Sequence, residues 1–214
     1  MGEKVGKREL NRVKRCAAIV EVAKDSFLQK GYAATSMSAI ADAVGGSKAT
    51  MWAHFGSKEE LFSAVVDSMV AQFALDIEDV LTSQSFSVPA LRRFCLRFVD
   101  CLLRESAARL FRLIMGEGER FPELGEVFWT RGPAKMVGHV TDFYATRFPE
   151  DEARALAQIT ITTIVGYRSQ ALMDPCPRPP GDAERFIDNF IAFLKLDGAH
   201  GEAPDDQAGP SQPA

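Results

Sequence analysis

The sequence predicts an all-α protein with a small three-helix N-terminal head and a larger helical body. Apolar residues recur at three- and four-residue steps along most of the chain, which is typical of amphipathic helices. No sustained alternation of apolar and polar residues indicates a strand, and no Asn-Gly or Asp-Gly pair indicates a hairpin. With 46% hydrophobic and 25% charged residues, the 214-residue chain can build one or two compact domains.

The head is expected to hold three helices, over residues 10–30, 36–44 and 47–55. The first carries an apolar stripe that ends at Phe27, and Gly31 follows where a left-handed stop is favoured. Each of the two short helices has a serine at its N-cap position, and only Gly45 and Gly46 separate them. Helices this short depend on packing against their neighbours for stability.

Seven further helices are expected in the body, over residues 57–81, 89–103, 107–116, 121–130, 133–148, 150–173 and 182–196. The first opens with a capping box made of Ser57 and Glu60. Gly132 and Pro133 separate the fourth from the fifth, because proline cannot donate a hydrogen bond to the preceding turn. The expected domains are residues 1–56, residues 57–197 and a disordered tail over residues 198–214 that is rich in Gly, Pro and Asp.

Charge is divided unevenly between head and body. Residues 1–58 hold ten Lys and Arg against five Asp and Glu, a net charge of +5, whereas the whole chain carries −4 and the remainder therefore −9. A basic head on an acidic body suits a module that binds a polyanion, because phosphate contacts need a local positive field. A solvated basic helix would give the same charge pattern.

Residues 36–55 have the layout of a helix-turn-helix, in which a short second helix presents its N-terminal residues to the major groove of DNA. Lys48 and Thr50 are polar at the start of that second helix, and Trp52 and His54 follow with hydrogen-bonding tips. Lys58 begins the next helix, where its ammonium and the helix N-terminus could share one phosphate. Apolar side chains are expected to pack the pair inward: Met37, Ile40, Ala41, Val44, Met51 and Phe55.

The run GYAATSMSAIADAVGGSKATMWAHFGSKEEL resembles the signature of TetR-family transcriptional regulators, and the resemblance extends over about residues 12–65. It implies that Thr35 and Ser36 meet the DNA backbone from the start of the first short helix. It further implies that Ser47, Lys48, Ala49 and Thr50 contact base edges or nearby phosphates. Trp52, His54 and Lys58 are implied to contact the DNA backbone. The sequence departs from the family pattern at Gly46, Ala49 and Trp52, which bears on operator preference rather than on the fold.

The later run FRLIMGEGERFPELGEVFWTRGPAKMVGHV is similar to the C-terminal domain of the AefR-like branch of TetR regulators, which implies a ligand-responsive body. Fifteen phenylalanines suit a mostly apolar site for an apolar or aromatic effector. The residues expected to line it are Phe73, Phe98, Phe111, Met115, Trp129, Met136 and Phe143. The polar anchors considered are Arg97, Arg112, Glu117, Thr141 and Gln158. Most aromatic and methionine residues at helical spacing are nevertheless plain core.

A homodimer is expected, because one recognition helix reads only a few base pairs and useful specificity needs two copies on a palindromic operator. The resemblance implies that the last two long helices of each subunit form the dimer contact. Their apolar faces are Leu156, Ile159, Thr160, Thr163, Ile164 and Tyr167 on one helix and Phe186, Phe190, Phe193 and Leu194 on the other. Alternatively, these faces close the core of the monomer. Effector binding is expected to swing the helix that starts at Ser57 and so change the separation of the recognition helices.

No pattern of an enzyme, a metal site or a cofactor-binding loop stands out, and the three histidines are scattered. The four cysteines lack metal-ligand and disulfide spacing; a redox switch at Cys101 is a minor alternative. No stretch reaches the roughly 20 apolar residues of a membrane span, and no secretory signal is recognised, so a cytoplasmic protein without a membrane partner is expected. The main alternative function is a ligand-binding or interaction protein that keeps the fold without binding specific DNA.

Overall fold

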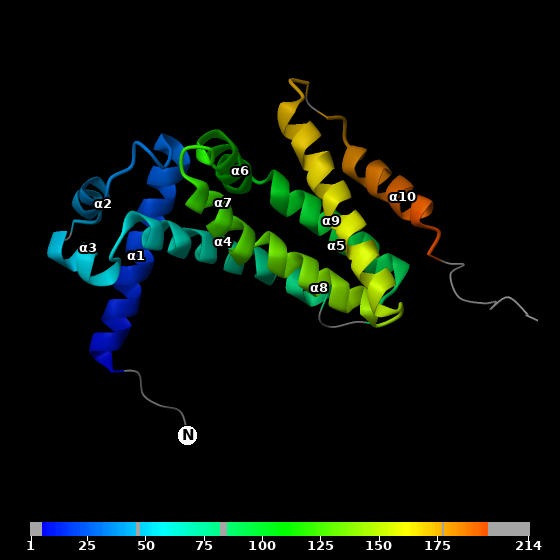
Figure 1. Cartoon of the computed structure of the whole chain (residues 1–214), viewed down its shortest axis with the longest axis horizontal. Coiled ribbons are helices and arrows are strands. Elements are labelled where there is room, and N and C mark those ends of the chain that lie inside the picture. The colour runs from blue at the N-terminus through cyan, green and yellow to red at the C-terminus, as the bar shows by residue number, and fades with distance from the viewer. Residues whose placement is uncertain (1–5, 46–47, 82–84, 177, 197–214) are drawn as a thin grey trace, which may run out of the picture.

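A computed structural model describes residues 6–45, 48–81, 85–176 and 178–196. Within these ranges every regular element is an α-helix, which confirms the all-α prediction, and Figure 1 shows an elongated molecule with α2 and α3 at one end and α10 at the other. The helices are α1 (Lys7–Lys30), α2 (Met37–Val44), α3 (Lys48–His54), α4 (Lys58–Leu81), α5 (Val88–Leu103), α6 (Glu105–Glu117), α7 (Pro122–Arg131), α8 (Pro133–Ala145), α9 (Glu150–Met173) and α10 (Asp182–Leu194).

Local signals set the helix ends close to where the sequence predicts them. Ser36 caps α2 and accepts a hydrogen bond from the N–H of Ala39 at 3.2 Å, while Gly45 ends the same helix in the left-handed region at φ 72°. The Ser57 hydroxyl accepts from the N–H of Glu60 at 3.0 Å at the start of α4. The largest differences are three residues each: α1 begins at Lys7 rather than at the expected residue 10, and α8 ends at Ala145 rather than at the expected residue 148. The tail over residues 198–214 lies outside the described residues.

The head does not close its hydrophobic core with α1 to α3 alone. Its buried cluster includes Phe62 and Val65 of α4 and continues to Leu110 of α6 and Leu124 of α7. Phe27, Tyr32 and Phe62 form an aromatic group with ring centroids 5.5–5.6 Å apart. The head and the body therefore share a continuous packed surface across the expected boundary at residues 56 and 57.

The body core lies between α5, α8, α9 and α10. Phe86 packs against Phe143, Tyr144 and Phe148, and the hydroxyl groups of Tyr144 and Thr160 lie 2.9 Å apart inside this core. The long helix α4 runs from the head into the body, so it belongs to both (Figure 1). Over the part of the chain that the structure describes, no helix combines the length and apolar character needed to cross a bilayer.

Candidate nucleic-acid interface

The short helices α2 and α3 pack on the head with one face each and leave the other face to solvent. Met37, Ile40 and Ala41 of α2 are buried, as are Met51 of α3 and Phe55, which follows it. Val44 is partly buried against the same cluster. This confirms the predicted inward-facing set, and it fixes which face of α3 points outward.

The outward face of α3 carries Ala49, Trp52 and Ala53, all of which are exposed. The Trp52 side chain is 51% exposed although tryptophan is a large apolar residue, and an indole N–H can donate a hydrogen bond to an acceptor on a bound molecule. Ser47 lies outside the described residues, and of Lys48 and Thr50 the structure describes the α3 backbone only. A helical face with a small residue near its N-terminus and an exposed indole about one turn later can approach the edge of a DNA groove.

Three further predicted contact residues flank this face. Ser36 is exposed at the start of α2, and the His54 ring is half-buried beside Phe55, with centroids 6.5 Å apart. Lys58, at the start of α4, holds its ammonium 4.2 Å above the Tyr32 ring. Burial lowers the pKa of Lys58, and the nearby carboxylate of Glu117 opposes that shift. Lys58 therefore packs on the aromatic ring of the turn that follows α1.

Thr35, in contrast, is buried, with 4% of its surface exposed. Its hydroxyl donates to the carbonyl of Gly31 at 2.7 Å and lies 3.2 Å from the carbonyl of Ser26. The stronger of these bonds satisfies the carbonyl of Gly31, the residue that ends α1. The side chain therefore connects α1 to the start of α2, and we leave it out of the proposed DNA-contact surface.

Replacing Thr35 with valine, which keeps the shape but removes the hydroxyl, should lower the free energy of unfolding by about 1 kcal/mol. The affinity of the folded protein for DNA should stay within about twofold of wild type, because no DNA-facing group changes. Urea denaturation and fluorescence anisotropy with labelled DNA measure the two effects. A weaker affinity for DNA at unchanged stability would instead place this hydroxyl on the phosphate backbone.

Glu117, considered above as an effector anchor, instead joins the body to the head. Its carboxylate accepts from the N–H of Tyr32 at 2.8 Å and from the N–H of Ala33 at 2.7 Å, in the turn that follows α1. Gly31 begins this turn at φ 86° and ψ 167°, a conformation that is essentially restricted to glycine. The last residue of α6 therefore holds the turn that leads into α2. We refer to this pair of hydrogen bonds as the Glu117 clamp.

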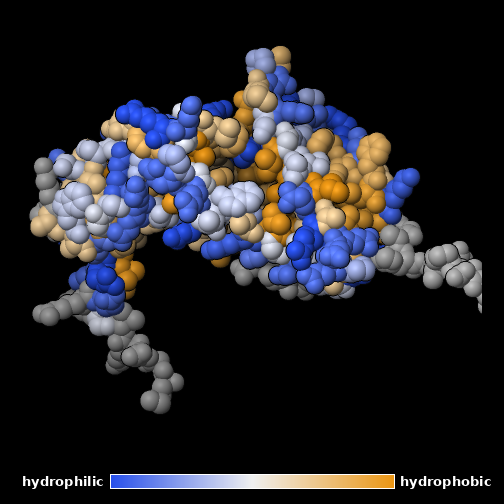
Figure 2. Space-filling view, viewed as in Figure 1, coloured by the Kyte–Doolittle hydropathy of each residue, from blue (hydrophilic) through white to orange (hydrophobic). Residues whose placement is uncertain are grey.

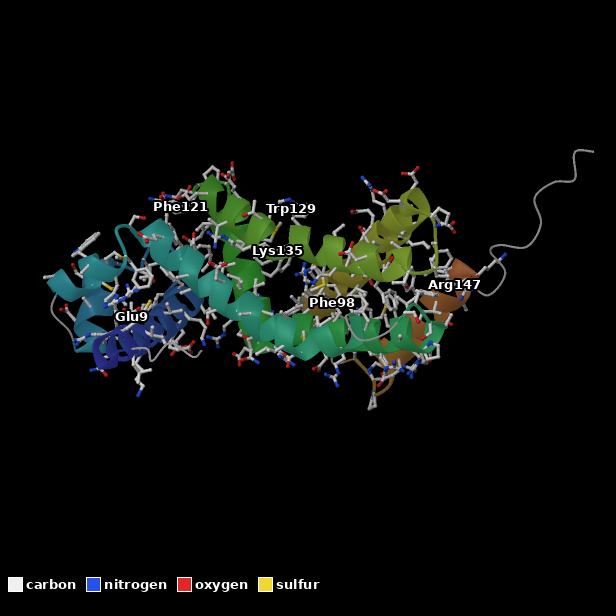
Figure 3. All side chains as sticks on the ribbon, turned by 90° about the horizontal axis from the view of Figure 1, so that it is seen from below. Glu9, Phe98, Phe121, Trp129, Lys135 and Arg147 are labelled. Carbon is white, nitrogen blue, oxygen red and sulfur yellow. The ribbon has the colours of Figure 1, made fainter. Side chains whose placement is uncertain are left out.

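Four of the residues predicted to line the effector site belong to the body core or pack against it: Phe73, Phe98, Met136 and Phe143. Of the other three, Phe111 is half-buried, and Met115 and Trp129 are exposed. Phe73 and Phe98 meet edge to face at 5.5 Å, and Phe143 packs against Phe86 in the body core. Met136 is partly buried against the same core. Figure 3 shows Phe98 among the helices of the body and Trp129 on the outer side of α7, and the side chain of Trp129 is 57% exposed.

Of the predicted polar anchors besides Glu117, three hydrogen-bond to nearby parts of their own or a neighbouring helix. Arg97 donates to the carbonyl of Asp76, Thr141 to the carbonyl of Val137, and Gln158 to the hydroxyl of Thr162. Arg112 is exposed.

Sequence reasoning missed Arg168, which is buried in α9 with its guanidinium carbon 3.7 Å above the Phe111 ring. The signal was present, because Arg168 interrupts the apolar stripe formed by Ala157, Ile161 and Ile164.

The predicted dimer faces divide between the core and the surface. Thr160, Ile164 and Tyr167 are buried within the monomer, as is Phe190 of α10. Phe193 of α10 is 84% exposed, and Ile159 of α9 is also exposed. Figure 2 shows hydrophobic side chains gathered at the end of the molecule where α9 and α10 lie. One side of α9 and one side of α10 thus belong to the core, and the other side of each helix leaves an apolar side chain exposed.

Two cysteines of the body, Cys95 and Cys101, are buried and poorly suited to thiolate chemistry. Burial raises the pKa of Cys95 to about 12 and that of Cys101 to about 11, so both thiols are protonated at neutral pH. This disfavours the redox switch considered for Cys101. Among the described residues, no three His, Cys, Asp or Glu side chains are grouped so that they could hold a metal ion.

Two family models match the chain, one in each part of the fold. The model for bacterial regulatory proteins of the tetR family matches residues 19–65, which include α2 and α3. The model for the C-terminal domain of AefR-like transcriptional repressors matches residues 89–154, from α5 into α9. Together they cover just over half of the chain.

Curated relatives show the same similarity over shorter stretches. The transcriptional activator FasR of Mycolicibacterium smegmatis is 32% identical over 113 residues, which are 53% of this chain and 50% of FasR. The transcriptional repressor ComR of Escherichia coli is 35% identical over 85 residues, 39% of this chain and 40% of ComR. The chain thus spans half or less of the length of these two relatives.

Solved structures extend the similarity to nearly the whole fold. A protein from Mesorhizobium loti classed as a TetR-family transcriptional regulator is 27% identical with a TM-score of 0.74, over 86% of this chain and 96% of that one. The flavonoid-responsive regulator FrrA is 25% identical with a TM-score of 0.66, over 85% and 96% of the two chains. The helix-turn-helix of the head, the helical body and both family models lead to one conclusion: the chain belongs to the TetR family of transcriptional regulators, with an AefR-like C-terminal domain.

Proposed function

We propose that this regulator works as a homodimer that binds a palindromic operator through its two copies of α3 and releases it when a small effector binds the body. The observation that carries the proposal is the outward face of α3, where Ala49 and Trp52 are exposed over a closed apolar core. A face that no other described part of the chain covers, at the end of a net-positive head, suits insertion into the major groove. We take repression as the mode of action, although the named relatives include both an activator and a repressor.

The exposed apolar residues of α9 and α10 support dimerisation. Ile159 and Phe193 lie on faces that the monomer core leaves uncovered. Burying such side chains against a second copy is favourable by roughly 25 cal/mol per Å² of apolar surface. In the dimer the two α3 helices should lie about 34–36 Å apart, one turn of the duplex, so that both enter the same side of the DNA.

Two connections can carry a signal from the body to the head. The first is α4, which begins beside α3 and continues into the body, where Arg131 of α7 forms an ion pair with Asp67. The second is the Glu117 clamp at the end of α6. A body conformation that shifts α4 and α6 together would change the spacing of the recognition helices, and the effector would select that conformation. That FrrA is named flavonoid-responsive supports a small-molecule effector of some aromatic character here.

The test is selection of bound fragments from a pool of random duplexes, combined with sedimentation of the free protein and of its complex with DNA. We expect a dimer and an enriched palindrome whose half-sites are one helical turn apart, with affinity that falls steeply as salt increases. If no sequence is enriched at a salt concentration where random DNA no longer binds, the alternative of an interaction protein that keeps the fold is favoured.

Two lysine substitutions test how the head divides its contacts. Lys48→Ala should reduce the preference for the operator over random DNA by about 1–3 kcal/mol, because this residue is proposed to reach base edges. Lys58→Ala should weaken binding to all sequences similarly and reduce the slope of log affinity against log salt by about 0.9 for each phosphate that the variant no longer neutralises. Affinity measured on both DNAs at several salt concentrations separates the two roles, and equal effects of the two variants on operator and random DNA would contradict them.

A further inference from the structure

Arg168 of α9 is the one charged residue that is buried within the described parts of the chain, with 5% of its surface exposed. Its guanidinium carbon lies 3.7 Å from the centre of the Phe111 ring, which belongs to α6. The Nε–H is the donor of its guanidinium that is fully buried without an acceptor, and no hydrogen bond or ion pair is found between Arg168 and another described residue. Burial lowers the pKa of Arg168, although an arginine keeps its charge in proteins.

Arg178 is an arginine of the same protein whose charge is paired with a carboxylate. Its guanidinium also lies over an aromatic ring, that of Tyr167 at 4.6 Å, and its Nε is likewise buried without an acceptor. However, its Nη1 donates to the carboxylate of Asp182 at 2.9 Å, so its charge is paired. Arg168 has the ring but lacks the carboxylate. Because a buried charge without a partner is costly, a missing anion is the simplest physical reason for keeping an arginine at this position.

The ring beneath Arg168 continues into an apolar strip that reaches the surface. Phe111 is half-buried, and Met115, one turn further along α6, is 68% exposed. Residues four apart lie on the same side of a helix, so the two side chains form one apolar track that leads from solvent to the guanidinium. A molecule with an acidic group and an apolar portion would satisfy both features at once.

We propose that Arg168 binds the carboxylate of the effector, which is therefore an amphipathic organic acid whose apolar portion lies along Phe111 and Met115; this rests on the effector-controlled function proposed above. A guanidinium presents paired donors that match the two oxygens of a carboxylate. A phosphate dianion is a poorer fit, because its second negative charge would need a second buried cation, and Arg168 is the single one described. Phe111 and Glu117 belong to the same helix, so binding at one part of α6 acts on the clamp at its end.

Thermal unfolding of the full-length protein at neutral pH, with matched acids and amides as probes, tests the proposal. The pairs are decanoate with decanamide and 4-phenylbutyrate with 4-phenylbutyramide, with inorganic phosphate as a further arm. The wild type should bind at least one acid about tenfold to hundredfold more tightly than its amide, as calculated from the concentration dependence of Tm. Arg168→Met should abolish that preference while leaving the affinity for the amide within about threefold.

Unliganded variants provide a readout that does not depend on the choice of probe. Arg168→Met removes a charge without a partner, so its Tm should equal or exceed that of the wild type. The matched control Arg178→Met removes a paired charge and should lower Tm. A lower Tm for both variants would show that Arg168 has a structural partner, and would overturn the proposal.

The remaining outcomes separate this inference from the proposed function. The assignment of a carboxylate would be overturned if the wild type bound acids and amides equally, or bound neither. It would also be overturned if phosphate bound more tightly than any acid, or if Arg168→Met kept the preference for acids. Operator binding without any probe should be the same for wild type and Arg168→Met. If the wild type binds an operator but shows no acid preference, only the inference fails; if it binds no operator, the proposed function fails.

Discussion

Replacing Ala49 with glutamate is expected to lower the affinity of the protein for its operator by about 100-fold or more, which corresponds to roughly 2.7 kcal/mol. Ala49 is exposed at the second position of α3, on the face proposed to enter the major groove. A carboxylate there meets the negative potential of the DNA and also fills space that the methyl group leaves open. In the proposed dimer both heads carry the substitution, so on a palindromic site the penalty would apply twice.

The fold should tolerate this substitution, so the weaker binding would not reflect unfolding. An acidic residue in the first turn of a helix interacts favourably with the helix dipole. The matched control is Ala134→Glu, which adds the same charge at an exposed position in the first turn of α8, in the body. Fluorescence anisotropy with the selected operator, together with circular dichroism of both variants, gives the comparison. An equal decrease of affinity in the two variants, or operator binding retained by Ala49→Glu, would contradict the proposed role of the α3 face.

The parts of this protein that local signals determine could be predicted from the sequence. The ten helices of the described residues follow from apolar periodicity and from local caps. The Ser36 side chain begins α2 and the left-handed backbone of Gly45 ends it, without help from distant residues. The inward set of α2 and α3 could be predicted for the same reason, since a helical period assigns each apolar residue to one face. The outward face consists of the remaining residues of these helices, which include Ala49 and Trp52.

Roles that depend on distant partners could not be predicted in the same way. Glu117 lies in an acidic segment that resembles a solvated face, and its hydrogen bonds join it to backbone groups 84 and 85 positions away. The hydroxyl of Thr35 was expected to meet DNA because of its place in the family pattern, yet the structure buries it against the end of α1. Arg168 could have been noticed as a charge in an apolar stripe, but the ring beneath it and its lack of a carboxylate are properties of the tertiary fold.

Gly31→Ala is expected to lower the free energy of unfolding by about 3 kcal/mol, from two causes that act together. The backbone at Gly31 has φ 86° and ψ 167°, which costs a residue with a side chain about 1–3 kcal/mol. In addition, a Cβ at this position would lie 2.4 Å from Oε1 of Glu117, so the carboxylate would have to move away from the N–H groups of Tyr32 and Ala33. The variant therefore strains the turn and releases the Glu117 clamp.

The measurement is the urea midpoint and slope of Gly31→Ala beside those of Gly45→Ala. Gly45 also has a positive φ, 72°, but a Cβ there would meet nothing within 4 Å, so its replacement should cost only about 1 kcal/mol. Glu117→Ala isolates the contribution of the clash. In a background that already lacks the carboxylate, Gly31→Ala should cost at least about 1 kcal/mol less than it does alone, because the clash and the broken hydrogen bonds no longer contribute.

The same pair of substitutions shows whether the clamp matters for DNA binding. If the Glu117 clamp fixes the turn that leads into α2, Gly31→Ala and Glu117→Ala should each weaken operator binding more than Gly45→Ala does, when affinities are compared per folded molecule. Additive stability costs in the double variant would mean that the carboxylate and the glycine act independently. Equal stability costs at Gly31 and Gly45 would mean that the backbone conformation alone, and not the contact between α6 and the head, makes glycine necessary after α1.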